Sequence, residues 1–443
     1  MNTLVLFLRV WRATGVRNFC TNGDSNMYTT VLTKPCKTVP STSADFGKKI
    51  RQTNFILDPN AVHLNHGAYG ATPKPIMAEQ FRLMQVRDSN PELFIRYRYK
   101  DMYYKSVERV ANFVGSNPKN LVIVDNATAA MNAVIKSLKF KAGDKILVGD
   151  QSYKTVKTLA EFTSNESEGV EVVSMTLPLP LSSSDDLVRA FEKAIDANPG
   201  IKVAVIDHIN APTGIIYPVH QIIALCRERG ILSLIDGAHT PGHIPLQLDE
   251  LGADFYAASM YKWTFAPRGL ALLWIHPKYQ DSIHPPVTSH KQFSPRLQDR
   301  FCKQGCREDV PSIMGPAVID YYEQLGGMDT IMKYNSDLAE WAADMLSKAW
   351  GTEKLVLPDG MRCPGMHCIA VPDTEKTRSY IATCDSSTCI DLMFDLQDQH
   401  NVNCGMKFFM GKMWARISVH VYHHEEDFYK LRDAVKALLQ SDS

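Results

Sequence analysis

A lysine and an aspartate each follow an apolar segment in the middle of the chain. Asp236 ends the run ILSLID, and Lys262 comes shortly after the run ADFYAAS, beside Trp263. A lysine in apolar surroundings has a lowered pKa and can attack a carbonyl group. The alternative is a surface lysine whose stem lies along an aromatic ring.

The presence of Asp236 favours the chemical interpretation of Lys262. Pyridoxal phosphate is held at two distant points of its ring, by a lysine at the aldehyde and by a carboxylate at the ring nitrogen. The carboxylate keeps that nitrogen protonated, so that the ring accepts electrons from a substrate carbanion. Because two adjacent strand ends can carry both groups, the sequence predicts pyridoxal phosphate as the cofactor and Lys262 as the catalytic residue.

Two further strand ends offer groups for the same cofactor. A phosphate binds well at the N-terminus of a helix, and the run Asn126, Ala127, Thr128 opens a predicted helix directly after a strand. Simple helix capping would explain this run equally well. Tyr153 also lies beyond a strand end and could stack on the cofactor ring, although an isolated tyrosine would fit a core position just as well.

These residues are positioned by an alternation of strands and helices that begins near residue 105. Near-continuous apolar runs are typical of strands buried on both faces. Helical patterns separate them, as in the segment 218–230, where apolar residues recur at spacings of three and four. The alternation predicts a mainly parallel α/β sheet. The predicted strand segments are LVIVDN, KILVGD, GVEVVSMTL, KVAVIDHI, ILSLID, ADFYAAS and GLALLWI.

Ligands of such sheets bind at the carboxyl ends of the strands. Four aspartates fall at these ends: Asp125, Asp150, Asp207 and Asp236. One aspartate there is commonly a helix cap or a loop residue. Four in succession, with Asn126 and His239 beside them, indicate a polar edge that holds a ligand.

The pattern changes after about residue 315, where long helices, short strands and a last helix follow. We therefore expect a large α/β domain at 44–314 that binds the cofactor, and a smaller α+β domain at 315–443. Residues 1–43 are predicted to be a tail outside the fold. The tail carries Arg9, Arg12 and Arg17 and no acid before Asp24, which resembles a mitochondrial transit peptide. The alternative is a cytoplasmic protein with an N-terminal tail.

The composition excludes several classes of partner. The chain has 48 basic and 48 acidic residues, so no nucleic-acid or membrane-surface partner is expected. No apolar run reaches the length of a membrane span. The ten cysteines show no CxxC pair and no zinc-finger spacing, so we expect no metal site and free thiols in a reducing compartment.

Several motifs together resemble the class V aminotransferases of fold type I, in the branch of isopenicillin N epimerase-like and cysteine-lyase-like proteins. The resemblance covers about residues 50–435. It implies a pyridoxal-phosphate enzyme that acts on an amino acid as a small-molecule substrate and forms a homodimer. The motifs are VHLNHGAYG at 62–70, PTG at 212–214, DGAHTPG at 236–242, LGADFY at 251–256, KWTFAPRG at 262–269 and WARISVHVYHHEEDFYKL at 414–431.

The resemblance implies a role for each matching residue. Lys262 would form the Schiff base with the cofactor, Asp236 would bind the pyridine nitrogen, and His239 would lie near the ring hydroxyl. Tyr153 would stack on the ring. Arg416 would bind the substrate carboxylate through two parallel hydrogen bonds. The alternative is that Arg416 is a plain surface arginine on a strand, with no role in binding. The phosphate would be held by Ala127, Thr128, Ser259 and Tyr261, and the substrate by His66, Asn65 and Asn210.

The chain departs from the family pattern at three places. Tyr261 stands where the family usually has histidine. Cys306 stands where the family usually has a threonine that reaches the phosphate of the other subunit. The desulfurase relatives carry a nucleophilic cysteine before the last arginine, but Cys404 comes about four residues too early and Cys389 falls in a helical stretch. A persulfide mechanism is therefore disfavoured.

The predicted function is that of a pyridoxal-phosphate enzyme acting on an amino acid, with a role in cysteine metabolism. The family branch favours a C–S lyase on cysteine or a cysteine derivative. An aminotransferase or cysteine desulfurase comes next, and then an amino-acid epimerase. A protein that binds the cofactor without turnover is the least favoured alternative. The lysine–aspartate pair serves all of these reactions, so it does not choose among them.

Overall fold

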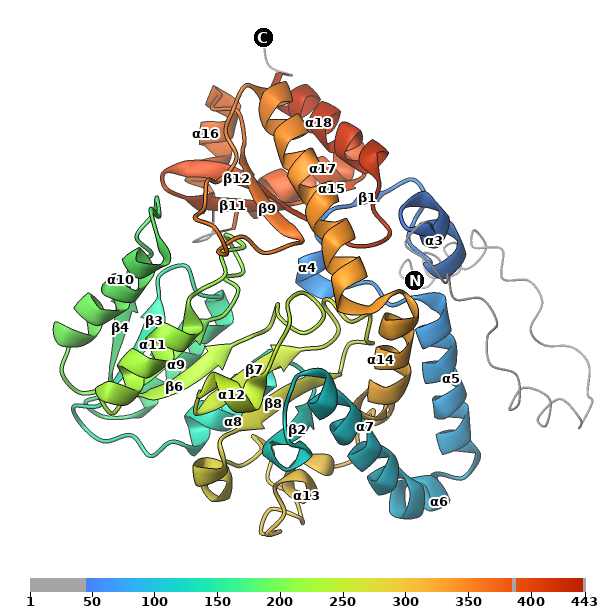
Figure 1. Ribbon diagram of the computed structural model, residues 1–443, viewed down its shortest axis with the longest axis vertical. Helices are drawn as coiled ribbons and strands as arrows, with labels where there is room; N and C mark the ends of the chain where they lie inside the picture. Colours follow the sequence, from blue (N-terminus) through green and yellow to red (C-terminus); the bar gives the residue numbers. More distant parts are fainter. Residues whose placement is uncertain (1–44, 385–387, 441–443) are drawn as a thin grey trace, which may run out of the picture. The chain divides into compact units, whose positions relative to one another are not determined.

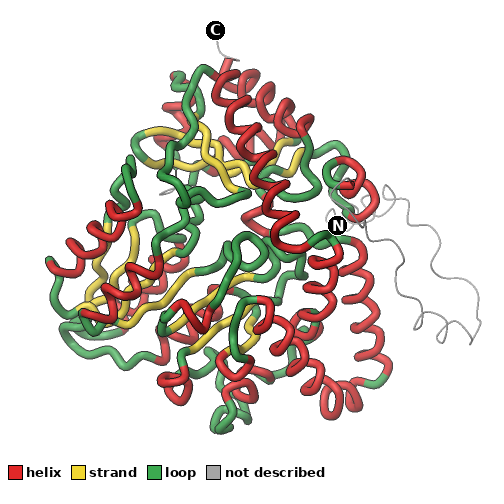
Figure 2. Tube along the Cα trace, in the orientation of Figure 1, coloured by secondary structure: helices red, strands yellow, loops and turns green. Residues whose placement is uncertain are grey.

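The predicted strands form one seven-stranded sheet in the computed structural model, which describes residues 45–384 and 388–440 (Figures 1 and 2). The order across the sheet is β2-β8-β7-β6-β5-β3-β4. The strands are β2 (Leu121–Val124), β3 (Lys145–Gly149), β4 (Glu171–Met175), β5 (Ile201–Asp207), β6 (Leu232–Asp236), β7 (Phe255–Ser259) and β8 (Ala271–Ile275).

The sheet is mainly parallel, as predicted. Only β8 runs antiparallel to its neighbours, β7 and β2. The other pairings, from β4 through β3, β5 and β6 to β7, are all parallel. The carboxyl ends of these strands therefore meet at one edge of the sheet.

Helices cover both faces of the sheet, which explains why its strands are apolar throughout (Figure 1). On one face α8 (Ala127–Ser137) and α9 (Lys154–Glu166) pack on the strands, and on the other face lie α10 (Ser184–Asp196) and α11 (Val219–Glu228). Successive residues of one strand point to opposite faces of the sheet and belong to different hydrophobic cores. Leu147 of β3 belongs to the second face, while Ile146 and Val148 belong to the first.

The C-terminal part of the chain builds a separate small sheet, drawn in orange and red in Figure 1. This sheet is antiparallel, with the order β11-β12-β9. Its strands are β9 (Met366–Ala370), β11 (Gly405–Phe409) and β12 (Lys412–Ser418), and the helices of this part are α14 (Gly315–Gln324), α15 (Gly327–Trp350), α16 (Glu375–Ala382), α17 (Ile390–His400) and α18 (Glu425–Gln440).

The N-terminal segment contributes to both parts of the molecule. The short strand β1 (Val62–His63) pairs in parallel with β10 (Val402–Asn403), and Val62 and Leu64 lie in the hydrophobic core of the C-terminal part.

A domain boundary at residue 314 stays a prediction, and the tail predicted over 1–43 lies outside the described residues. The remaining helices are α3 (Lys48–Asn54), α4 (His66–Tyr69), α5 (Lys74–Ser89), α6 (Pro91–Leu93), α7 (Tyr99–Phe113), α12 (Leu248–Leu251) and α13 (Leu297–Cys302).

Within residues 45–384 and 388–440, none of the helices combines the length and the apolar character that a membrane crossing requires.

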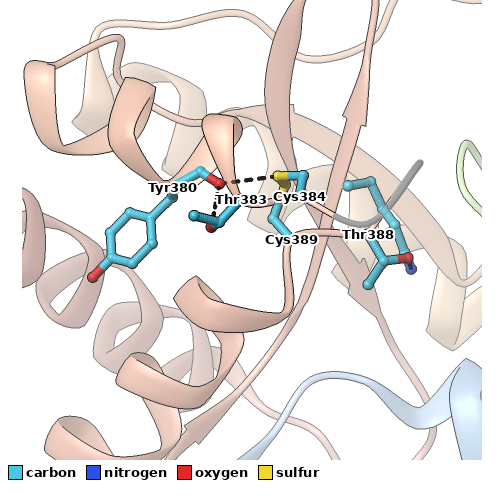
Figure 3. The surroundings of a disulfide bond; sticks show 6 residues. Tyr380, Thr383, Cys384, Thr388 and Cys389 are labelled. Carbon is cyan, nitrogen blue, oxygen red and sulfur yellow. Dashed lines mark hydrogen bonds between the residues drawn. A yellow bond between two sulfur atoms is a disulfide. The ribbon is translucent and has the colours of Figure 1, made fainter.

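The expectation of free thiols is wrong for one pair of cysteines. Cys384 and Cys389 form a disulfide, with their Cα atoms 4.3 Å apart (Figure 3). The pair is possible because α16 ends at Ala382 and α17 begins at Ile390, so that the two cysteines stand at neighbouring helix ends. The other cysteines of the described residues are free thiols: Cys226, Cys302, Cys306, Cys363, Cys368 and Cys404.

Candidate active site

The carboxyl edge of the large sheet carries both Asp236 and Lys262. Asp236 is the last residue of β6 and pairs with Ala257 of the parallel neighbour β7. Lys262 lies in the turn that follows β7, which is closed by a hydrogen bond from the Thr264 N–H to the Met260 carbonyl at 3.2 Å. Adjacent parallel strands thus bring the carboxylate and the amine to the same edge, as the spacing predicted.

The Lys262 amine has the properties of a nucleophile. Burial lowers its pKa to about 8; the Asp236 carboxylate opposes this shift, and the positive charge of Arg416 adds to it. The Nζ atom lies 3.1 Å from Nε2 of His239. A substantial fraction of the amine is therefore neutral near physiological pH, as attack on a carbonyl group requires.

Asp236 is a buried carboxylate with capacity to bind a ligand. Its Oδ1 accepts a hydrogen bond from the Ala238 N–H at 3.0 Å. Burial raises its pKa, while that N–H and the charge of Lys262 oppose the rise. A protonated ring nitrogen placed beside Asp236 would favour the ionised carboxylate, because an opposite charge stabilises it.

His239 lies between the lysine and the aromatic core. Its Nδ1 accepts a hydrogen bond from the indole N–H of Trp263 at 3.4 Å, so the imidazole proton belongs on Nε2, which faces Lys262. Burial, together with the charges of Lys262 and Arg416, holds the pKa of His239 well below its usual range. The ring is therefore neutral, and its Nε2 lies within hydrogen-bond distance of the Lys262 amine.

Two of the residues predicted to bind phosphate, Ala127 and Thr128, open helix α8. Asn126 caps this helix, and its side chain accepts from the Ala129 N–H at 2.8 Å. Ala127 and Thr128 are the first two helical residues, and within the described part of the chain no acceptor takes their N–H groups. Helix α8 packs against β7, whose last residue, Ser259, is fully buried and has an Oγ without a hydrogen-bond partner among the described residues.

Arg416 is buried in the middle of β12 and is not a plain surface arginine. Its Nη2 donates to Asn65 Oδ1 at 2.8 Å, and its Nη1 donates to the carbonyl of Ala211. Its Nε is buried and has no partner among the described residues. A guanidinium has five N–H groups, so donors remain for a carboxylate.

His66 contacts the lysine turn through the protein backbone. One ring nitrogen hydrogen-bonds the Tyr422 hydroxyl at 2.8 Å, and the other contacts the carbonyl of Lys262. Both nitrogens are thus bonded to the protein, so the geometry favours a supporting contact over direct substrate binding.

At the end of the same segment Gly70 has a φ of 68°, and a Cβ there would lie 1.9 Å from the Tyr261 carbonyl oxygen. Only glycine fits this close approach to the lysine turn.

Asn210 and Tyr153 lie near the same edge of the sheet. Asn210 is fully buried, and its amide donates to the Gln151 carbonyl at 3.0 Å while its Oδ1 accepts from the Thr213 hydroxyl at 2.7 Å. Tyr153 stands at the N-terminus of α9 with a side chain 51% exposed. That exposure leaves its ring free of core packing, as stacking on a ligand would require.

Asp207 is a site residue to which the sequence interpretation gave no role. It ends β5 and pairs with Asp236 across the sheet, and its Oδ2 accepts from the Ser152 hydroxyl at 2.7 Å. Burial and the nearby charge of Asp236 raise the pKa of this carboxyl. Its place among the four strand-end aspartates was the signal that could have singled it out.

The cysteines of the C-terminal part offer no reactive thiol. Cys404 is fully buried, and burial raises its pKa to about 12, which is the opposite of what a nucleophile needs. Cys389 is bonded to Cys384. Cys306 is exposed but stands in the loop after α13.

The residues of this edge fit pyridoxal phosphate. A nucleophilic amine, a buried carboxylate and a helix N-terminus stand at three places along one sheet edge, as the aldehyde, the ring nitrogen and the phosphate require. The buried Ser259 hydroxyl without a partner supports this fit, because a buried polar group is usually hydrogen-bonded.

The comparison with known families agrees with this chemistry. The model of the class V aminotransferase family matches residues 95–431 of the chain. Over 443 aligned residues the chain is 27% identical to the probable chloroplastic L-cysteine desulfhydrase of Arabidopsis thaliana, which covers 91% of each chain. It is 26% identical to the isopenicillin N epimerase of Amycolatopsis lactamdurans, over 86% of this chain and 96% of the epimerase.

Solved structures share the fold. A complex of the cystine C–S lyase C-DES with its reaction product cysteine persulfide matches with a TM-score of 0.70 at 17% identity, over 85% of this chain and 97% of that chain. The expected fold type and the expected family branch are both confirmed.

Proposed function

The chain belongs to the class V aminotransferase family and is a pyridoxal-phosphate-dependent enzyme, and from this premise we propose that it is a C–S lyase acting on cysteine or a cysteine derivative. The similarity to a cysteine desulfhydrase along 91% of both chains supports the substrate. The observation that carries the reaction type is the state of the thiols: Cys404 is buried with a raised pKa and Cys389 is in a disulfide. Direct elimination needs no thiol nucleophile, whereas a persulfide mechanism does.

The residues of the sheet edge would have separate roles in binding the cofactor. When bound, the cofactor supplies an electron-accepting ring that stabilises negative charge at the substrate α-carbon. Asp236 would hold the ring nitrogen. Ala127, Thr128 and Ser259 would hold the phosphate.

Arg416 would orient the substrate through its carboxylate. Its guanidinium is already fixed by Asn65 and the Ala211 carbonyl, so little conformational freedom is lost on binding. Asn210 and Tyr153, which lie along the same edge, would complete the walls of the site. Tyr261 stays a candidate contact to the phosphate.

Lys262 is the proposed base. Its Nζ would accept the α-proton of the substrate, and the same nitrogen would then be the acid that protonates the departing sulfur. The neutral ring of His239, whose Nε2 lies 3.1 Å from this Nζ, would help to position the amine. A base with a pKa close to the working pH transfers protons most efficiently, and the pKa of about 8 meets this condition.

Product analysis tests the reaction type. Purified, cofactor-loaded protein is incubated with single amino acids, and pyruvate, sulfide, alanine and keto acids are measured together. Equal amounts of pyruvate and sulfide from cysteine are the expected result, and Lys262→Ala is the inactive control. Alanine with persulfide would indicate a desulfurase, a keto acid without sulfide an aminotransferase, and a D-amino acid an epimerase.

We also propose that the enzyme is a homodimer and that its N-terminal segment directs it to mitochondria. The family resemblance supports the dimer, and the arginines of the N-terminal segment support the targeting. Light scattering on the purified protein tests the dimer. Uptake of the full chain by isolated mitochondria, compared with a chain that begins at residue 44, tests the targeting.

A further inference from the structure

A second cation lies beside Arg416 on the small sheet. Arg416 of β12 pairs with Gly405 of β11, and Lys407 stands two residues further along β11 (strands labelled in Figure 1). Residues two apart on a strand point to the same face. Lys407 is therefore the diagonal neighbour of Arg416 on one face of the sheet, at a spacing of about 7–8 Å.

Lys407 has no acidic partner among the described residues. It is partly buried, and its Nζ donates to the Thr388 hydroxyl at 3.0 Å. The ionisable groups that influence it, apart from Arg416, are the thiols of Cys368 and Cys404. Burial raises the pKa of both thiols to about 12, so both are neutral.

The charge of Lys407 reaches the centre of the site. Burial is the main cause of the lowered pKa of His239, and the charges of Lys262, Arg416 and, least, Lys407 add to it; the His239 ring lies 3.1 Å from the Lys262 amine. Burial and the charge of Arg416 in turn lower the pKa of Lys407 to about 7. The face of the small sheet that carries Arg416 thus carries a second basic side chain, whose charged form is disfavoured by burial and by Arg416.

An anion placed beside Lys407 would favour its charged form, because an opposite charge stabilises it. Arg416 would be neutralised by the carboxylate that every amino acid carries. Among residues 45–384 and 388–440 no carboxylate pairs with Lys407, so a second acidic group of the ligand would supply its counter-charge.

We propose that Lys407 binds a second acidic group at the far end of the substrate, so that the enzyme prefers cysteine derivatives whose sulfur substituent carries an anion. This inference rests on the proposed function and narrows its substrate class. It makes Lys407 a specificity-determining residue that acts beside Arg416 and apart from the proton transfer at Lys262.

A pair of substrates that differ in one charge tests the proposal. S-carboxymethyl-L-cysteine carries the second carboxylate, and S-carbamoylmethyl-L-cysteine replaces it with a neutral amide of almost the same size. The native enzyme should favour the acid. Lys407→Met, which removes the ammonium and keeps an apolar stem, should lower kcat/KM for the acid by about 10–100-fold and change the amide little, because a hydrogen bond to a charged group is lost.

Controls separate this role from a structural one. Lys412→Met removes an exposed lysine of the same small sheet that pairs with the exposed Glu353, and should leave both substrates unaffected. If Lys407→Met is unstable, Lys407→Gln gives the same comparison and retains a donor for Thr388. An equal loss for both substrates, or no loss for either, would overturn the proposal.

A binding measurement distinguishes failure of this inference from failure of the proposed function. Glutarate and butyrate, which have two charges and one, are compared by the thermal shift they cause in the cofactor-loaded protein. Glutarate should stabilise the native protein more than butyrate does, and this difference should disappear in Lys407→Met. If no cysteine derivative releases sulfur, the proposed function is wrong, and the glutarate comparison on the same protein still decides the role of Lys407. Equal shifts for the two acids in the native protein would contradict that role.

Discussion

The pH dependence of cofactor attachment reports directly on Lys262. Only the neutral amine attacks the aldehyde, so the rate of attachment to the cofactor-free protein follows the neutral fraction. With a pKa of about 8, this fraction is roughly 9% at pH 7 and roughly 90% at pH 9. The rate should therefore rise only about tenfold over this interval and level off above pH 8.

An unperturbed lysine would behave differently. With the ordinary pKa of 10.5, the neutral fraction would rise about a hundredfold between pH 7 and pH 9 and would still be rising at pH 9. Attachment is followed by visible absorption, and the same measurement on butylamine corrects for ionisation of the cofactor itself. Borohydride reduction followed by peptide mapping identifies the modified residue.

Two results would refute this reasoning. One is a hundredfold rise without a plateau, which would mean that burial does not lower the pKa of the amine. The other is a label on a lysine different from Lys262. Asp236→Asn provides an independent check, since removing the carboxylate that raises the pKa of Lys262 should move the plateau to lower pH.

Four other substitutions give separate tests. Lys262→Ala should fold and lower turnover by at least about 10²–10⁴-fold, the contribution of a general base, and equal kcat in the variant would remove that role. Arg416→Lys should raise KM by about tenfold or more without changing the cofactor spectrum, because one ammonium cannot replace a bidentate guanidinium; an unchanged KM would place the carboxylate elsewhere. Cys404→Ser should keep most sulfur release in the product assay, and its loss with the cofactor still bound would favour a desulfurase. The pKa of the Asp207 carboxyl is raised in the folded protein, so the free energy of unfolding of the native protein should fall as pH rises from 3.8 towards neutrality. The stability that Asp207→Asn loses relative to the native protein, measured by urea unfolding, should therefore be smaller at pH 8 than at pH 5.

Much of the large sheet and of its ligand edge could be predicted from the sequence. Strands buried on both faces must be apolar throughout, so their positions are visible as runs, and the residue after each run must lie at the sheet edge. For this reason Asp236, Lys262 and the opening of α8 at Ala127 were found without coordinates. The same rule also marked Asp207, but nothing in the pattern said that it would pair with Asp236.

Contacts between distant segments could not be predicted. Strand β8 runs antiparallel to both of its neighbours, yet its apolar run resembles those of the other strands, because hydrophobicity does not depend on strand direction. Strand β1 has two residues and therefore no periodicity. The position of Lys407 beside Arg416 depends on the register of the β11–β12 hairpin, and the bond between Cys384 and Cys389 depends on where two helices end.

The pairing of β1 with β10 has a consequence for how the enzyme is made. Val62 pairs with Val402, and these residues are 402 − 62 = 340 positions apart. At about 5–20 residues per second, a ribosome needs roughly 17–68 seconds to travel that distance. Until then the core that buries Val62 and Leu64 is incomplete, and Asn65 lacks its partner Arg416. We expect the substrate side of the site to be assembled only when synthesis is nearly finished, so nascent chains halted before Arg416 should be able to hold the cofactor edge but not the substrate.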